Sequence, residues 1–154
     1  CVMSFVASGV NPSVTINNNG FFPNIDTDDF VKTQKLDATF TNERLVFALT
    51  LAITDANRAL NSWQVAKETA GYSALTDVPA VSVNNVSTLV TFYKQAVYSF
   101  TKANLLEKYR DYDTTNQGGK KADNLEPNID IHRRDARWAI ADLQNKSRTV
   151  VELI

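Results

Sequence analysis

The sequence has very few of the residues from which metal, disulfide and nucleophilic sites are built. Among its 154 residues there is one cysteine, Cys1, and one histidine, His132. A single cysteine excludes an internal disulfide framework and a thiolate metal cluster, and it is typical of a chain that folds in a reducing cytoplasm. The motifs GxSxG, GxxxxGK[ST] and HExxH are also absent. Because these motifs and clusters mark common catalytic and metal sites, the sequence predicts neither an enzyme nor a cofactor site.

Long apolar runs and an excess of charge are missing as well. No run approaches the roughly 20 apolar residues of a membrane span, and the first residues lack the pattern of a signal peptide, so we expect a soluble, unexported protein. The 16 Lys and Arg residues nearly balance the 17 Asp and Glu residues. This balance disfavours strong nonspecific binding to duplex nucleic acid, which requires many unopposed cations, but it leaves a local basic patch open.

The sequence does show helical periodicity, and the length of the chain suits one domain with a single core. Apolar residues recur at three- and four-residue steps, which is typical of amphipathic helices. The predicted helices are a short one from a cap at Asp26 to near Lys35, a long one from Thr41 or Asn42 to a stop at Gly71, a third from a cap at Ser87 to about Tyr112, and a fourth that starts between Asp123 and Glu126. We therefore predict a mainly α fold, a bundle of about four helices with an extended arm and an extended tail.

The segments outside these helices divide the chain into an N-terminal arm (1–25), a helical bundle (26–146) and a C-terminal tail (147–154). In the arm, β-branched and polar residues alternate before an Asn/Gly turn, which predicts an extended segment or strand pinned by Phe21 and Phe22. Residues 72–86 and 114–121 are interpreted as loops. The tail has apolar residues without helical periodicity, so we expect it to dock on its own core or on a neighbour. These tail residues are Val150, Val151, Leu153 and Ile154.

The fourth predicted helix and the loop before it combine the only histidine with a group of cations. His132 lies on the apolar stripe of that helix, which favours a packing or interface role over a general base. Acidic residues are interleaved with the cations, which favours salt bridges within or between subunits over contact with nucleic acid. The cations are Lys120, Lys121, Arg133, Arg134 and Arg137.

The chain also resembles a known family in a collinear series of short blocks. These blocks are FFPNID (21–26), LTDVPA (75–80), FYKQAV (92–97), LLEKYRDYD (105–113), KKADNLEPNID (120–130) and RRDARWAIADLQNKSR (133–148). In this order they resemble the head completion proteins of contractile-tailed temperate bacteriophages, the GpL family, over roughly residues 20–154. The blocks contain no invariant catalytic motif.

The resemblance implies a structural, non-enzymatic protein that acts after DNA packaging. Such a protein would join the portal vertex of the filled head, close the DNA exit and provide a platform for the tail. Its partners would be the portal protein, the next connector or tail terminator protein, further copies of itself in a ring, expected to be a dodecamer, and DNA that passes without specific binding. Its place would be the neck of the virion, after assembly in the host cytoplasm.

Two groups of site residues follow from this interpretation. Phe21, Phe22, Val150, Val151, Leu153 and Ile154 are predicted to contact the portal or a neighbouring subunit. Lys120, Lys121, Arg133 and Arg137 are predicted to face the channel or its DNA. The alternative is a small helical protein that binds nucleic acid or regulates another protein through the basic loop and the fourth helix.

Overall fold

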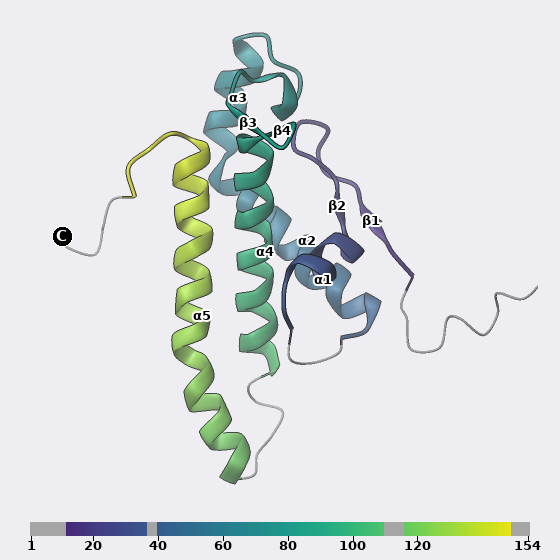
Figure 1. Cartoon of the computed structure of the whole chain (residues 1–154), viewed down its shortest axis with the longest axis vertical. Coiled ribbons are helices and arrows are strands. Elements are labelled where there is room, and N and C mark those ends of the chain that lie inside the picture. The colour runs from purple at the N-terminus through teal and green to yellow at the C-terminus, as the bar shows by residue number, and fades with distance from the viewer. Residues whose placement is uncertain (1–11, 37–39, 110–115, 149–154) are drawn as a thin grey trace, which may run out of the picture.

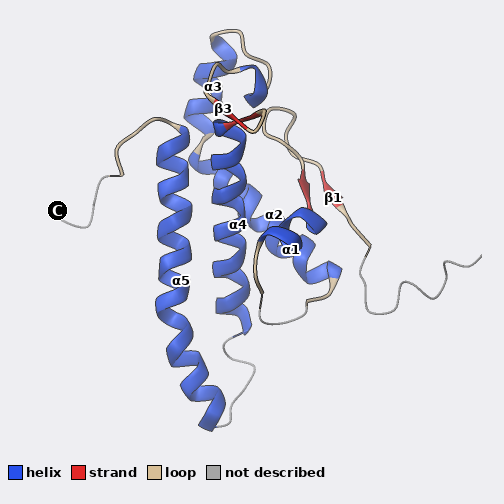
Figure 2. Ribbon diagram, in the orientation of Figure 1, coloured by secondary structure: helices blue, strands red, loops and turns tan. Residues whose placement is uncertain are grey.

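The computed structural model describes residues 12–36, 40–109 and 116–148, with the side chains of residues 109 and 116–127 outside that description (Figure 1). Helices dominate this part of the chain, and the strands are short (Figure 2), so the prediction of a mainly α fold is confirmed. In chain order the elements are β1 (Thr15–Ile16), β2 (Ile25–Asp26), α1 (Thr27–Thr33), α2 (Asn42–Ala59), α3 (Asn61–Thr69), the 3-10 helix η2 (Leu75–Asp77), β3 (Ser82–Val83), β4 (Val86–Ser87), α4 (Thr88–Tyr109) and α5 (Asn116–Leu143).

Helix α4 lies at the centre of the fold, with α5 along one side and α2 behind it (Figure 1). Its apolar stripe is wide enough to serve both neighbours, and Tyr93, Ala96 and Val97 on it are fully buried. A helix that packs on two sides needs such a broad apolar face, because each contact covers only part of the helix circumference. The width of this stripe in the sequence thus agrees with the packing of α4 against both α2 and α5.

The N-terminal arm folds back onto the helices as a small antiparallel hairpin. Thr15 pairs with Asp26 and Ile16 pairs with Ile25. Asp26 also caps α1, as predicted, because its carboxylate accepts a hydrogen bond from the backbone N–H of Asp28 at 3.0 Å. The same core cluster therefore includes residues of the arm and of the helices.

The prediction of one long helix from residue 41 or 42 to residue 71 is wrong in its middle, because the helix breaks at Leu60. There the backbone turns out of helical geometry, with φ −100° and ψ 5°. The hydrogen bonds nevertheless continue, from Leu60 N–H to the Ala56 carbonyl at 3.0 Å and from Gln64 N–H to the Leu60 carbonyl at 2.8 Å. Since the apolar repeat and the backbone bonds both run through the bend, the periodicity does not reveal it.

The two ends of this helical region match the sequence signals. The Thr41 hydroxyl accepts a hydrogen bond from Arg44 N–H at 3.3 Å and so caps the start of α2. Gly71 adopts φ 105° just after α3 and ends it, because glycine reaches this left-handed region without steric cost. Both predicted end points are confirmed.

Residues 72–86 are not the plain loop that was predicted. They contain η2 and a second hairpin, in which Val83 of β3 pairs with Val86 of β4. Asn84 and Asn85 both have positive φ, as a two-residue type I′ turn requires. The Asn84–Asn85 pair between Val83 and Val86 is a sequence signal for this hairpin, whereas the nearby Pro79 favours a loop. The Ser87 hydroxyl accepts from Leu89 N–H at 3.2 Å and caps α4 as predicted.

Helix α5 begins at Asn116, which corrects its predicted start between Asp123 and Glu126. Its backbone is helical through Gly118–Lys121, which were assigned to a loop, and through Pro127. The prediction treated Pro127 as a residue that must sit in the first turn. A proline removes a single backbone donor, however, and a helix can continue through it with a bend.

Candidate functional site

Within the described ranges no three His, Cys, Asp or Glu side chains gather as a metal ion would require. None of the helices there has the length and apolar character that a membrane span needs. The candidate functional residues of the sequence analysis are located in the structure one group at a time below.

Phe21 and Phe22 were predicted to contact the portal or a neighbouring subunit, and the structure places both in the core of their own chain. The Phe22 ring stacks on Tyr93, with ring centroids 4.7 Å apart, and Phe21 meets Trp63 edge to face at 6.3 Å. One side chain, Asn19, accepts the backbone N–H of both phenylalanines at 3.0 and 3.1 Å. These rings thus fasten the arm to the helices and are not available as an outer surface.

A closed set of three polar side chains lies beside these rings. Asn18 donates to the Tyr93 hydroxyl at 2.8 Å, that hydroxyl donates to Asn57 at 2.6 Å, and Asn57 donates back to Asn18 at 2.8 Å. Burial raises the pKa of Tyr93. Because each residue comes from a different part of the chain, the set joins the arm, α2 and α4 at one point.

Two arginines of the predicted basic surface form ion pairs within the chain. Arg133 on α5 pairs with Glu107 on α4, and Arg134 pairs with Asp135 at 2.9 Å. Arg137 is exposed. The side chains of Lys120 and Lys121 lie outside the described residues. Two of the cations are therefore matched by carboxylates of the same chain, which lowers the charge that they present to a polyanion.

His132 lies half-buried on α5. Burial lowers the pKa of its imidazole, the cation of Lys102 on α4 lowers it further, and Asp135 opposes both effects. The neutral imidazole is therefore favoured in the folded protein near pH 7. A neutral, half-buried ring on this face suits packing between α4 and α5.

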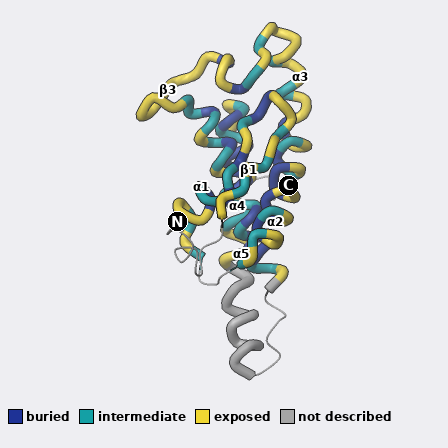
Figure 3. The backbone as a smooth tube through the Cα atoms, turned by 90° about the vertical axis from the view of Figure 1, so that its right-hand side faces the viewer, coloured by how far each residue is buried: buried dark blue, intermediate teal, exposed yellow. Residues whose placement is uncertain are grey.

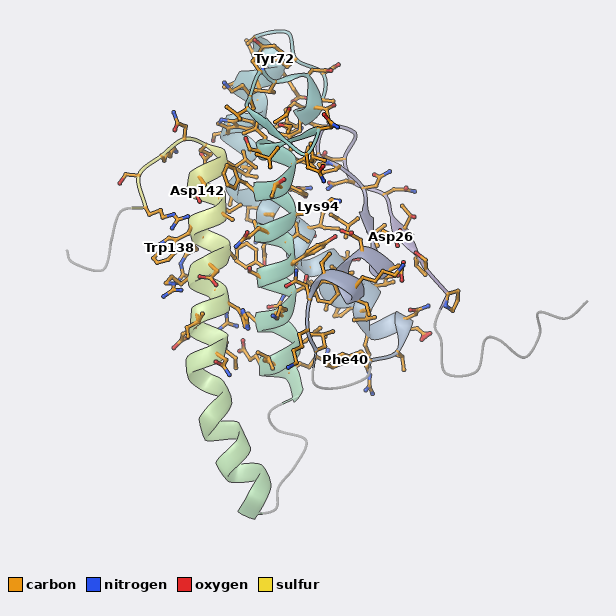
Figure 4. All side chains as sticks on the ribbon, in the orientation of Figure 1. Asp26, Phe40, Tyr72, Lys94, Trp138 and Asp142 are labelled. Carbon is orange, nitrogen blue, oxygen red and sulfur yellow. The ribbon has the colours of Figure 1, made fainter. Side chains whose placement is uncertain are left out.

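The end of α5 is held by a cluster that the sequence did not reveal, which we call the tail clamp: Arg134, Trp138, Asp142 and Arg148. Arg148 makes two hydrogen bonds to the Asp142 carboxylate, at 3.0 and 2.6 Å. The guanidinium groups of Arg134 and Arg148 lie over the Trp138 ring, 4.2 and 4.9 Å from its centroid. Trp138 and Asp142 lie on the same side of α5 (Figure 4). A bidentate arginine–carboxylate pair fixes direction as well as distance, so the clamp fixes the chain where it leaves the helix.

The backbone at this point supports the same geometry. Asn145 has φ 57°, and its N–H donates to the Asp142 carbonyl at 3.0 Å, while Lys146 N–H donates to the Ala141 carbonyl at 2.8 Å. This pattern is a Schellman cap, which ends a helix and turns the chain away from its axis. The predicted docking residues Val150, Val151, Leu153 and Ile154 follow the clamp directly and lie outside the described residues.

Three of the four clamp residues could have been suspected from their spacing, although the sequence analysis did not group them. Arg134 and Trp138 are four residues apart, as are Trp138 and Asp142, so all three share a face of a helix. The contribution of Arg148 was not accessible in this way, because it depends on the chain turning back after Asn145.

Comparison with known proteins gives consistent results. The model of the family described as phage head completion protein (GPL) matches residues 16–154. A head completion/stabilization protein of Escherichia phage P2 is 37% identical over 139 residues, which cover 90% of this chain and 82% of that protein. Among solved structures, none matches the chain.

Proposed function

The chain belongs to the phage head completion protein (GPL) family, and from this premise we propose that it is a structural protein that completes the DNA-filled head of a tailed phage. In the finer form of the proposal, copies of the chain form a ring on the portal, with twelve subunits to match a twelvefold portal. The ring closes the DNA exit and offers a platform to the next connector or tail terminator protein. The chain then resides in the virion neck, after assembly in the host cytoplasm.

The family match supports the head completion role, and the observation that carries the proposed docking of the tail is the tail clamp. An apolar segment at the end of a chain contributes most to docking when its root is already oriented, because less conformational entropy is lost on binding. The clamp orients that root through Asp142, Trp138 and Arg148. Val150, Leu153 and Ile154 are then presented to a groove of the portal or of the adjacent subunit, where a strand addition would pair their backbone.

The charge distribution supports passage of DNA through the proposed ring. Arg133 and Arg134 are paired with carboxylates of the same chain, and the chain has a formal net charge of −1. Affinity for duplex DNA grows with the number of phosphates that unopposed cations neutralise. Lys120, Lys121, Arg133 and Arg137 remain the residues proposed to face the DNA, and the pairing of Arg133 with Glu107 lowers the charge that this group would offer to the phosphates.

The proposal for the tail is tested by replacing Val150, Leu153 and Ile154 with serine. Portal-bearing, DNA-filled heads should bind the wild-type protein and should no longer bind this variant in a sedimentation assay. A matched control replaces the exposed valines Val31 and Val65 with serine; it should bind as the wild type does. Helical circular dichroism should be the same for all three proteins. Full binding by the tail variant would refute the docking role of the tail.

The head completion function itself has a separate test. Filled heads prepared without this protein should release DNA on dilution or mild heating, and adding the purified protein should prevent the release. If heads without the protein retain their DNA equally well, the proposed function fails.

A further inference from the structure

Asn19 and Gly20 form the only Asn-Gly pair of the sequence, and they lie in the segment between β1 and β2. Both residues are exposed (yellow in Figure 3). The backbone nitrogen of a residue that follows asparagine can attack the side-chain carbonyl carbon (Cγ) of that asparagine and close a ring. Three groups decide whether this happens: the nitrogen that attacks, the oxygen that takes up negative charge, and the nitrogen that leaves.

The attacking nitrogen, that of Gly20, is open to its target. Gly20 has φ 90°, a conformation that suits glycine, and the space where a Cβ would stand has no atom within 4 Å. Among the hydrogen bonds of the described residues, none has the Gly20 N–H as its donor. No protein acceptor therefore holds this proton, and water or hydroxide can remove it.

The side-chain carbonyl oxygen of Asn19 (Oδ1) is held by two donors. The backbone N–H groups of Phe21 and Phe22 donate to it at 3.0 and 3.1 Å. Negative charge develops on this oxygen when the Gly20 nitrogen bonds to Cγ, and two N–H groups that are already in place stabilise that charge, as in an oxyanion hole. One such donor is worth about 10²-fold or more in the rate of an enzyme. The pair therefore offsets the freedom to close the ring that the folded turn loses relative to an unfolded chain.

The leaving nitrogen of Asn19 (Nδ2) donates a hydrogen bond to the Gln64 side chain at 3.1 Å. Together with the two bonds to Oδ1, this bond fixes the carboxamide in one orientation, folded back over the turn that contains Gly20. Nδ2 leaves as ammonia once it gains a proton, and water supplies that proton. All three groups of the reaction are thus positioned by this turn and by Gln64.

We propose that Asn19–Gly20 is a self-modification site, at which the folded chain converts Asn19 into aspartate and isoaspartate. The Gly20 nitrogen forms a bond to Asn19 Cγ, the Cγ–Nδ2 bond breaks, and ammonia leaves, which gives a five-membered succinimide. One water molecule then opens this ring. Attack at Cγ gives aspartate, and attack at the backbone carbonyl carbon of Asn19 gives isoaspartate. No group is oxidised or reduced, and water is the only co-reactant.

The two products should differ in how they hold the N-terminal arm. In aspartate, the carboxylate still accepts from Phe21 and Phe22, and only the hydrogen bond to Gln64 is lost. In isoaspartate, the main chain runs through the former side chain and is one carbon longer. The acceptor then cannot keep its place while Phe22 stays stacked on Tyr93. The isoaspartyl product should therefore release the arm, whereas the aspartyl product should keep it attached.

Incubation of the whole protein at mildly alkaline pH tests the site, with mass spectrometry of its peptides as the measurement. Asn19 should convert before other exposed asparagines such as Asn61 and Asn84. Its rate in the folded protein should equal or exceed the rate in the same protein unfolded in guanidinium chloride, because only the folded state holds both donors at Oδ1. The matched control, Asn19→Gln, should not convert at this position, since its longer side chain would have to close a six-membered ring.

Two results would overturn the inference. One is an intact Asn19 in a sample in which Asn61 or Asn84 has converted. The other is a lower rate at Asn19 in the folded protein than in the unfolded chain, which would mean that its hydrogen bonds protect the carboxamide.

Limited proteolysis tests the consequence for the arm. Chymotrypsin cleaves after aromatic residues, and it reaches the bond after Phe21 only when the arm leaves the core. Asn19→Asp copies the aspartyl product and should be cut no faster than the wild type. The isoaspartyl fraction of an incubated sample, identified by enzymatic methylation, should be cut several-fold faster. Equal rates for that fraction and for Asn19→Asp would show that the arm stays attached in both. None of these measurements involves phage heads, so they do not depend on the proposed function.

Discussion

At the residue scale, substitution of Phe22 tests how strongly the N-terminal arm is attached to the helices. Its ring is buried and stacks on Tyr93, so Phe22→Ala should lower the free energy of unfolding by about 3–5 kcal/mol, through lost burial and the cavity left behind. Urea denaturation measures this change. Phe47→Ala is the control, since that ring is mostly exposed and its loss should cost no more than about 1 kcal/mol. Equal effects of the two substitutions would contradict the assigned packing.

His132 predicts how stability depends on pH. Burial and Lys102 lower the pKa of its imidazole in the folded state, so below its ordinary pKa of about 6.5 the unfolded chain binds more protons at this residue than the folded chain. The contribution of His132 to the free energy of unfolding is therefore fully present above that pH. It is lost as the pH falls through the lowered pKa of the folded state. Thermal unfolding between pH 7.5 and 5 should show the decline, and His132→Gln should flatten it. An unchanged slope in the variant would assign the decline to other groups.

At the element scale, the second hairpin depends on the left-handed backbone of its turn. Asn85 has φ 63°, a region that glycine adopts freely and a β-branched residue does not, at a cost of roughly 1–2 kcal/mol. Asn85→Val should therefore open the hairpin, and hydrogen exchange at Val83 and Val86 should become faster. Asn85→Gly should leave that exchange unchanged. The assigned turn would be wrong if glycine and valine had the same effect.

The helices show where sequence reasoning succeeds and where it stops. The caps at Asp26 and Thr41 and the stop at Gly71 follow from local chemistry, and each is confirmed by its hydrogen bonds or by its φ angle. The break at Leu60 was missed, because the apolar repeat and the backbone hydrogen bonds both pass through it. Local signals thus identify helix ends that are made by capping side chains or by glycine. They do not identify the bend at Leu60, a residue that is buried in the core.

At the scale of the whole molecule, the balance of charge predicts weak binding to DNA. The net charge is −1, and Arg133, Arg134 and Arg148 are paired within the chain. The purified protein should therefore not bind duplex DNA at about 50 mM salt, which the fluorescence anisotropy of a labelled duplex measures. Binding that falls steeply with salt and disappears in a Lys120→Ala, Lys121→Ala variant would instead support the nucleic-acid alternative.

The candidate site was predicted only in part. The tail residues from Val150 to Ile154 were identified from composition and remain a prediction. Phe21 and Phe22 were correctly expected to pin the arm, but their assignment to an outer interface conflicts with their burial. The sequence shows that two aromatic residues will seek an apolar partner, and it cannot show whether that partner belongs to the same chain.

The sequence by itself determined the fold class, the family, the caps at Asp26, Thr41 and Ser87 and the stop at Gly71, because each depends on residues that are close together or on an ordered set of short blocks. The tertiary structure decided which apolar residues became core and which stayed exposed. Phe22 meets Tyr93 across 71 positions of sequence, and Asn18 joins Asn57 and Tyr93 in one hydrogen-bonded set. Contacts over such separations depend on how the helices pack as a whole, and no local pattern of residues contains that information.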